Sequence, residues 1–178
     1  MGSLIKTYSE EKIKGKIYTP RFIVEKILDD INFKNKGVLG KKILDPACGD
    51  GRFLCVIVER ILKYTKKNDI EKNLSYVYGW DIDEDAIKNC IINLNEILKK
   101  NGINIKIKWN IERTNSLEKL TNDLFSKKFN DQFDFIVGNP PYIRIQHLDE
   151  NSRKYIQKNY TFCRRGSTDI YIAFFELC

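Results

Sequence analysis

Hydrophobic and polar residues recur along this chain with two different periods, and these periods predict its strands and helices. Short apolar runs that end beside glycine or aspartate are typical of buried strands, and such runs lie at residues 42–45, 76–80 and 133–137. Elsewhere, apolar residues recur at intervals of three and four, as on one face of a helix. This spacing predicts helices at residues 20–31, 53–62, 84–100, 117–126 and 166–178.

A further strand is predicted at residues 103–111, where apolar and polar residues alternate strictly from Ile103 to Ile111. Alternation of this kind is typical of a strand with one face exposed to water. In a parallel sheet, which is normally covered on both faces, such a strand fits best at an edge.

Two helix starts carry recognisable capping residues. Thr19 precedes Pro20, so we expect Thr19 to be the N-cap and Pro20 to take the first helical position. Asp83 is expected to cap the helix that follows the second strand.

The order of these elements predicts an α/β fold. A strand, a turn and a helix follow one another three times, and a fourth strand comes after them. Strands that alternate with helices build a mostly parallel sheet. We expect the strand order 3-2-1-4, with ligands bound at the carboxyl ends of the strands.

Composition and charge fit a globular protein with one domain. The 178 residues are 42% hydrophobic and 31% charged, and the net charge is +7. A basic balance favours polyanionic partners such as nucleic acid. The longest fully apolar run, Phe53 to Val58, is far shorter than the ~20 residues of a membrane span, so no membrane partner is expected. Residues 1–14 are predicted to be a flexible segment, and residues 15–178 a single domain.

The cysteines and the histidine do not indicate a metal site. Five cysteines, an odd number, never occur as a C-x-x-C pair, and His147 is the one histidine. This set lacks the ligand spacing of a zinc site. We interpret the thiols as reduced residues of a cytoplasmic protein.

The first strand leads into a turn suited to binding a ligand. Asp45 is followed by Pro-Ala-Cys-Gly-Asp-Gly and then by a helix, so backbone N–H groups and a helix start meet there. Leu54 stands where a dinucleotide-binding G-x-G-x-x-G motif would have its third glycine. The second strand ends in Asp81, and an acidic residue there can accept hydrogen bonds from both hydroxyls of a ribose.

The fourth strand ends in a stretch with its own chemistry, Gly138-Asn139-Pro140-Pro141-Tyr142. Two prolines fix the backbone φ at roughly −65° and remove two N–H donors. The loop therefore offers an amide, a carbonyl and an aromatic face. These groups can hold a flat ring with an exocyclic amine, although a simple Pro-Pro turn with a surface tyrosine would have the same sequence.

Taken together, these motifs resemble the N6-adenine DNA methyltransferases of restriction–modification systems, in particular the TaqI and Eco57I group. The resemblance runs from about residue 15 to the end of the chain. Its motifs are Tyr-Thr-Pro at 18–20, Asp-Pro-Ala-Cys-Gly-Asp-Gly-Arg-Phe-Leu at 45–54, Gly-Trp-Asp-Ile-Asp at 79–83, Asn-Pro-Pro-Tyr at 139–142 and the helix at 166–176. Each motif alone is a weak signal, but their combination in this order is a strong one.

The resemblance implies a Rossmann-like methyltransferase fold and S-adenosylmethionine as the cofactor. The residues implied to bind it are Tyr18, Thr19, Asp45, Pro46, Ala47, Cys48, Gly49, Gly51, Asp81, Ile82, Asn115 and Ser116. Among them, Asp81 would bind the ribose and Ile82 would pack on the adenine. Many family members have an acidic residue where Asn115 stands.

The implied catalytic residues are Asn139, Pro140 and Tyr142, acting on an adenine flipped out of double-stranded DNA. No metal is implied. A restriction endonuclease partner, or a fused nuclease domain, is a further expectation of this family.

Three alternatives remain open at this point. Release-factor glutamine methyltransferases also carry Asn-Pro-Pro-Tyr, although their cofactor turn usually reads D-L-G-x-G-x-G. N4-cytosine methyltransferases more often have serine where Asn139 stands. A non-catalytic cofactor-binding fragment is the third, since the chain ends inside an apolar helix and a DNA-recognition domain is expected after residue 178.

Overall fold

The computed structural model describes residues 19–118, 133–164 and 168–177. The predicted flexible segment 1–14, the end of the 117–126 helix and Tyr18 lie outside this part of the chain. The described chain divides into two compact units, one of which is Thr19–Asn139 and the other of which contains Pro140–Cys178. The prediction of a single domain over 15–178 therefore stays a prediction.

The first unit contains a four-stranded parallel sheet in the order β3-β2-β1-β4, as predicted. The strands are β1 (Ile43–Asp45), β2 (Val77–Asp81), β3 (Asn110–Arg113) and β4 (Phe135–Ile136). All three residues of β1 are buried, because this strand lies between β2 and β4. The carboxyl ends of β1 and its neighbours therefore lie at one edge of the sheet.

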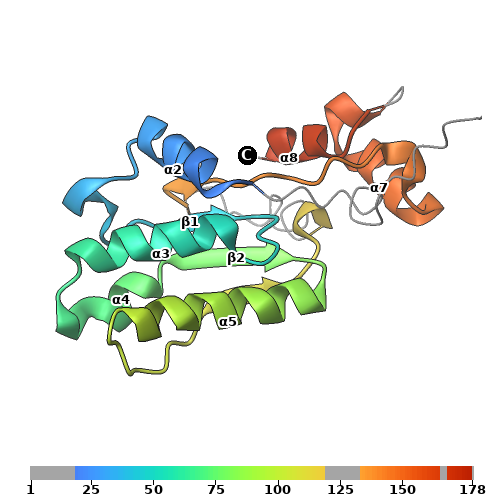
Figure 1. Cartoon of the computed structure of the whole chain (residues 1–178). Helices are drawn as coiled ribbons and strands as arrows, with labels where there is room; N and C mark the ends of the chain where they lie inside the picture. The colour runs from blue at the N-terminus through green and yellow to red at the C-terminus, as the bar shows by residue number, and fades with distance from the viewer. Residues whose placement is uncertain (1–18, 119–132, 165–167, 178) are drawn as a thin grey trace, which may run out of the picture. The chain divides into compact units, whose positions relative to one another are not determined.

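The helices of this unit are α2 (Arg21–Asp30), α3 (Arg52–Tyr64), α4 (Ile70–Leu74) and α5 (Glu84–Lys100). Helices α3 and α5 pack against each other along the sheet, and α2 packs against α3 (Figure 1). Their buried apolar residues join those of the strands in one hydrophobic core. The short helix α4 and the 3-10 turns Asn35–Val38 and Lys67–Asp69 were not predicted.

The structure corrects the predicted strand at residues 103–111. The strand begins only at Asn110, and residues 103–109 have no regular structure. Strand β2 begins at Val77, and its Tyr78 pairs with Asn110, so at most one residue before Asn110 has part of β2 beside it. Alternation of apolar residues persists in this segment without backbone pairing.

The structure also corrects the predicted cap of α2. Pro20, rather than Thr19, is the N-cap residue, and its side chain makes no capping hydrogen bond. The backbone N–H groups of Ile23 and Val24 instead donate to the Pro20 carbonyl. The cap predicted for α5 is confirmed, since the Asp83 side chain accepts from the N–H groups of Asp85 and Ala86.

The second unit contains α7 (Glu150–Asn159), α8 (Tyr171–Leu177) and the 3-10 turns Ile145–His147 and Thr161–Cys163. An antiparallel bridge joins Arg144 to Asp169. Helix α7 was not predicted, because its sequence carries few apolar residues. No helix in the described part of the chain is long and apolar enough to cross a membrane.

Candidate cofactor-binding and catalytic site

The turn after β1 is held by backbone hydrogen bonds to the neighbouring strand. The N–H group of Cys48 donates to the Trp80 carbonyl at 2.9 Å. The N–H group of Gly49 donates to Oδ2 of Asp81, also at 2.9 Å. Residues predicted from two separate motifs therefore meet at the carboxyl edge of the sheet.

Asp45, the last residue of β1, is a buried carboxylate directly before this turn, with only 1% of its surface exposed. Its Oδ1 atom accepts a hydrogen bond from the N–H group of Ala47 at 3.1 Å. Burial raises the pKa of Asp45 to about 7; the Ala47 hydrogen bond opposes this shift, and the charge of Asp81 adds to it. Such a group is stabilised in its ionised form by a nearby cation, which suits a ligand that carries positive charge.

Gly51 has a positive φ of 89° at the start of α3. A Cβ atom at this position would lie 2.7 Å from Sγ of Cys90 on α5, so the close approach of α3 and α5 requires glycine here.

The thiol of Cys48 is also close to Cys90. A hydrogen bond between the two thiols, together with burial, raises the pKa of Cys48 far above its usual range. Cys48 is therefore an uncharged thiol, and the turn's negative charge comes from carboxylates.

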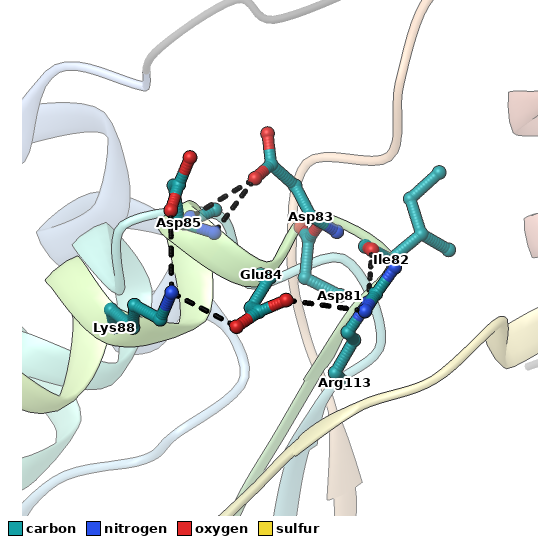
Figure 2. Close-up of polar contacts among 8 residues, drawn as sticks. Asp81, Ile82, Asp83, Glu84, Asp85, Lys88 and Arg113 are labelled. Atoms are coloured by element: carbon teal, nitrogen blue, oxygen red, sulfur yellow. Dashed lines mark hydrogen bonds and ion pairs between the residues drawn. The ribbon is translucent and has the colours of Figure 1, made fainter.

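The loop after β2 is organised by Asp81. Its Oδ1 atom accepts from the N–H group of Asp83 at 2.9 Å, while Oδ2 accepts from Gly49. Ile82, between the two aspartates, is 66% exposed although it is a large apolar residue. Figure 2 shows Ile82 pointing away from the carboxylates around it. The loop thus presents an apolar side chain beside an oriented carboxylate.

The residues after β3 contribute to the same edge. Ser116 is buried, and its hydroxyl donates to the Pro46 carbonyl at 2.5 Å, which ties this segment to the turn after β1. Asn115 Oδ1 accepts from the Leu117 N–H group, and its Nδ2 donates to Glu118. Both predicted residues therefore have structural hydrogen bonds of their own.

Gly138 brings the end of β4 against Asp45. A Cβ atom at Gly138 would lie 2.4 Å from Oδ1 of Asp45, so only glycine fits beside this carboxylate. Strand β4 pairs in parallel with β1, and the Val137 N–H group donates to the Leu44 carbonyl. Asn139 therefore directly follows Gly138, the residue that packs against Asp45.

Tyr142 belongs to the second unit, as does Pro140. Its ring is half exposed and lies 5.6 Å from that of Tyr171, centroid to centroid, with the planes tilted by 48°. The Ile170 N–H group donates to the Ile143 carbonyl at 2.7 Å, so the two tyrosine-bearing segments lie side by side.

The structure thus joins the predicted residues of the two cofactor motifs and ties Ser116 to them. Thr19 is buried just before α2. Pro140 and Tyr142 belong to a different unit from Asn139, although they follow it directly in the chain.

Sequence reasoning missed three residues that shape the site, namely Gly138 as a contact of Asp45, Arg113 beside Ile82, and Tyr171 beside Tyr142. The glycine between a buried strand and Asn-Pro-Pro-Tyr was a usable signal. The other two depend on pairings between distant segments.

The arrangement fits S-adenosylmethionine in two respects. The buried carboxylate of Asp45 and the carboxylate of Asp81 suit a cationic ligand with ribose hydroxyls. The exposed Ile82 offers an apolar contact for a flat base.

Comparison with known proteins agrees with this geometry. The Eco57I restriction-modification methylase family matches residues 75–178. The type II methyltransferase M.BanIII of Aneurinibacillus aneurinilyticus is 32% identical over 178 aligned residues, which cover 93% of this chain and 28% of that protein. The chain thus spans less than a third of this relative.

Two solved structures share the fold. The DrdV–DNA complex, determined by electron cryomicroscopy, matches with a TM-score of 0.64 and 20% identity over 94% of this chain and 19% of that one. A Listeria monocytogenes protein assigned to the class I S-adenosylmethionine-dependent methyltransferases matches with a TM-score of 0.51 and 19% identity, covering 88% of this chain and 39% of that one. From the family match and the curated relative, the chain belongs to the Eco57I restriction-modification methylase family.

Proposed function

We propose that the chain is the cofactor-binding and catalytic part of a DNA methyltransferase that transfers a methyl group to N6 of a flipped-out adenine. S-adenosylmethionine is the cofactor of this methyltransferase domain. The observation that carries the proposal is the packing of Gly138 on Asp45, because Asn139 directly follows this glycine. Family membership supports a role in a restriction–modification system.

The cofactor half of the reaction uses residues of the first unit. Asp45 and Asp81 provide negative charge, Asp81 receives the ribose hydroxyls, and Ile82 packs on the adenine of the cofactor. S-adenosylmethionine supplies an electrophilic methyl group on a positively charged sulfur. Ser116 holds the Pro46 carbonyl and thereby keeps the turn in place.

Asn139 acts on the target amine. Its amide oxygen accepts one N6 hydrogen, and the carbonyl of Pro140 accepts the other. These bonds draw the nitrogen lone pair out of conjugation with the ring, so that it becomes a nucleophile. An amide suits this position because it accepts hydrogen bonds without adding a charge to the site.

Tyr142 stacks on the flipped base. Removing a base from a duplex costs a few kcal/mol, and stacking on an aromatic ring offsets this by ~1–3 kcal/mol. The half-exposed ring of Tyr142 has a free area for such a contact. The net charge of +7 favours the DNA backbone as a partner. A restriction endonuclease, separate or fused, remains part of the proposal.

The proposal is tested by methyl transfer from labelled S-adenosylmethionine to mixed-sequence duplex DNA, followed by nucleoside analysis. N6-methyladenine is the expected product. Asn139→Ala should reduce transfer by about a hundredfold or more, since an oriented partner of the reacting group is lost, and should leave cofactor affinity nearly unchanged. Asn104→Ala, which alters an exposed asparagine in the same unit, is the matched control.

The outcomes separate the alternatives. N4-methylcytosine as the product would replace the adenine assignment, and methylation of protein glutamine alone would reject DNA as the substrate. Saturable cofactor binding without any transfer would reject a catalytic role for this chain. Loss of cofactor affinity in Asn139→Ala equal to its loss of transfer would reject the role given to that residue.

A further inference from the structure

Ile82, which the proposed function places on the cofactor's adenine, belongs to a loop with unusual support. The peptide unit between Ile82 and Asp83 is hydrogen-bonded at both of its polar groups. The N–H group of Asp83 donates to Oδ1 of Asp81 at 2.9 Å. The carbonyl of Ile82 accepts from Nε of Arg113 at 3.2 Å. The plane of this peptide, which adjoins the Cα atom of Ile82, is therefore held by residues of two strands.

Arg113 reaches the loop because of strand register. It is the last residue of β3 and pairs with Asp81, the last residue of β2. The ladder continues for one more bond, in which the Thr114 N–H group donates to the Asp81 carbonyl at 2.8 Å. Arg113 thus lies directly beside the loop, and the regular pairing of β2 with β3 brings its guanidinium within reach of the Ile82 carbonyl.

The guanidinium is itself oriented by a second contact. Its Nη1 atom lies 3.3 Å from Oε2 of Glu84, in the first turn of α5. The other oxygen of Glu84 lies 2.9 Å from Nζ of Lys88, one helical turn later. Figure 2 shows this chain of contacts running from Lys88 through Glu84 to Arg113 and the Ile82 carbonyl.

These contacts contribute little to the stability of the fold. The side chains of Arg113 and Glu84 are more than half exposed, and exposed ion pairs contribute little to folding stability. Their geometry has a local result instead: an exposed apolar side chain is held at a fixed angle beside the carboxylate of Asp81. Such an arrangement is useful where a flat ring must be received in one orientation.

We infer that Arg113 is a positioning residue for cofactor recognition, which acts through the Ile82 carbonyl to fix the apolar surface that receives the adenine ring. The inference rests on the proposed placement of adenine against Ile82. Arg113 itself makes no contact with the cofactor in this scheme, so its effect on affinity should depend on the Ile82 side chain.

The test is a double-mutant cycle read by calorimetric titration of the whole chain with S-adenosylhomocysteine. Arg113→Ala should weaken binding by about tenfold, because the peptide beside Ile82 then lacks the charge-assisted hydrogen bond that holds it and must become ordered on binding. Ile82→Ala should weaken it as well. In the Ile82→Ala background, Arg113→Ala should have almost no further effect, because the surface that it orients is gone.

Two further variants distinguish positioning from a general effect. Arg113→Lys keeps the charge and one donor, so it should restore part of the affinity. Lys88→Ala removes the ion pairs of Lys88 with Glu84 and Asp85 but leaves the hydrogen bond between Arg113 and the Ile82 carbonyl. It should change affinity by less than about twofold. In the absence of ligand, the midpoint temperature of thermal unfolding of each variant should stay close to that of the unaltered chain.

Each contrary result has a distinct meaning. Equal losses from Arg113→Ala with and without the Ile82 side chain would overturn the inference, as would no loss at all. If Ile82→Ala leaves affinity unchanged, the adenine does not pack on Ile82, and both the inference and that part of the proposed function are wrong.

Discussion

At the scale of single residues, Asp45 combines burial with a position between two functional segments. Its carboxylate accepts from the turn at Ala47 and packs against Gly138, which precedes Asn139. A change in the charge of Asp45 therefore acts on both the turn after β1 and the segment that contains Gly138 and Asn139.

The raised pKa of Asp45, about 7, predicts how the cofactor-free chain depends on pH. The folded state holds this proton up to about pH 7, whereas the unfolded chain releases it near pH 4. Asp45 therefore contributes its full stabilisation below pH 4 and loses it as the pH rises from 4 to 7. Over this range the free energy of unfolding should fall by an amount on the order of 4 kcal/mol, and above pH 7 the contribution is constant.

Asp45→Asn should remove this pH dependence, because the amide keeps an acceptor for Ala47 but does not titrate. Urea unfolding at pH 5 and pH 8, without cofactor, measures it. We expect the variant to be more stable than the unaltered chain at pH 8 and to bind S-adenosylmethionine more weakly. A slope between these pH values that is the same in both proteins would contradict the prediction.

Gly138→Ala should destabilise the chain by about 1–3 kcal/mol, the usual cost of forcing an extra carbon into a packed site. The added carbon would meet Oδ1 of Asp45, whose burial leaves it little room to move. Gly37→Ala is the matched control, because nothing lies within 4 Å of a Cβ atom there. Chemical denaturation of both variants measures the difference, and equal effects would show that the contact with Asp45 is unimportant.

At the scale of elements, α5 is the helix that connects the Asp81–Asp83 loop to the core. The helix begins at Glu84, near Ile82 in the chain, and its buried face packs on α3. The cap residue Asp83 joins loop and helix, because its side chain accepts from two N–H groups of the first turn at 2.9 and 3.3 Å.

Asp83→Ala should therefore lower the free energy of unfolding by about 1 kcal/mol, the usual cost of losing a helix cap. Asp83→Ser should recover most of this, since serine also accepts hydrogen bonds from the first turn. Thermal unfolding monitored by circular dichroism is the measurement. If the alanine and serine variants unfold at the same temperature, the cap does not stabilise α5.

At the scale of the whole molecule, a ligand that binds only the folded state must shift unfolding. S-adenosylhomocysteine at a hundred times its dissociation constant should stabilise the chain by about 2.7 kcal/mol. Differential scanning calorimetry with increasing ligand measures the shift. Asp81→Ala should lose it at the same ligand concentration, because the loop then lacks its hydrogen bonds to Gly49 and Asp83. An unchanged shift in that variant would reject Asp81 as a cofactor residue.

Much of the fold could be predicted from the sequence, because local patterns carry the information. Apolar runs located the buried strands, and their alternation with helices predicted the observed order β3-β2-β1-β4. The cap of α5 was predicted correctly from Asp83 alone. The beginning of β3 and the cap of α2 were not, because the first depends on how β3 pairs with β2 and the second on the backbone at Pro20.

In the candidate site, too, some features could be predicted from local sequence and others could not. By itself, the sequence determined the family resemblance, the cofactor motifs and the position of Asn139, since each is a run of adjacent residues with its own chemistry. Only the tertiary structure decided that Asp45 lies against Gly138, that Arg113 holds the Ile82 carbonyl, and that Tyr171 packs beside Tyr142. These contacts join segments far apart in the chain, and strand register or packing creates them, so no local pattern could have specified them.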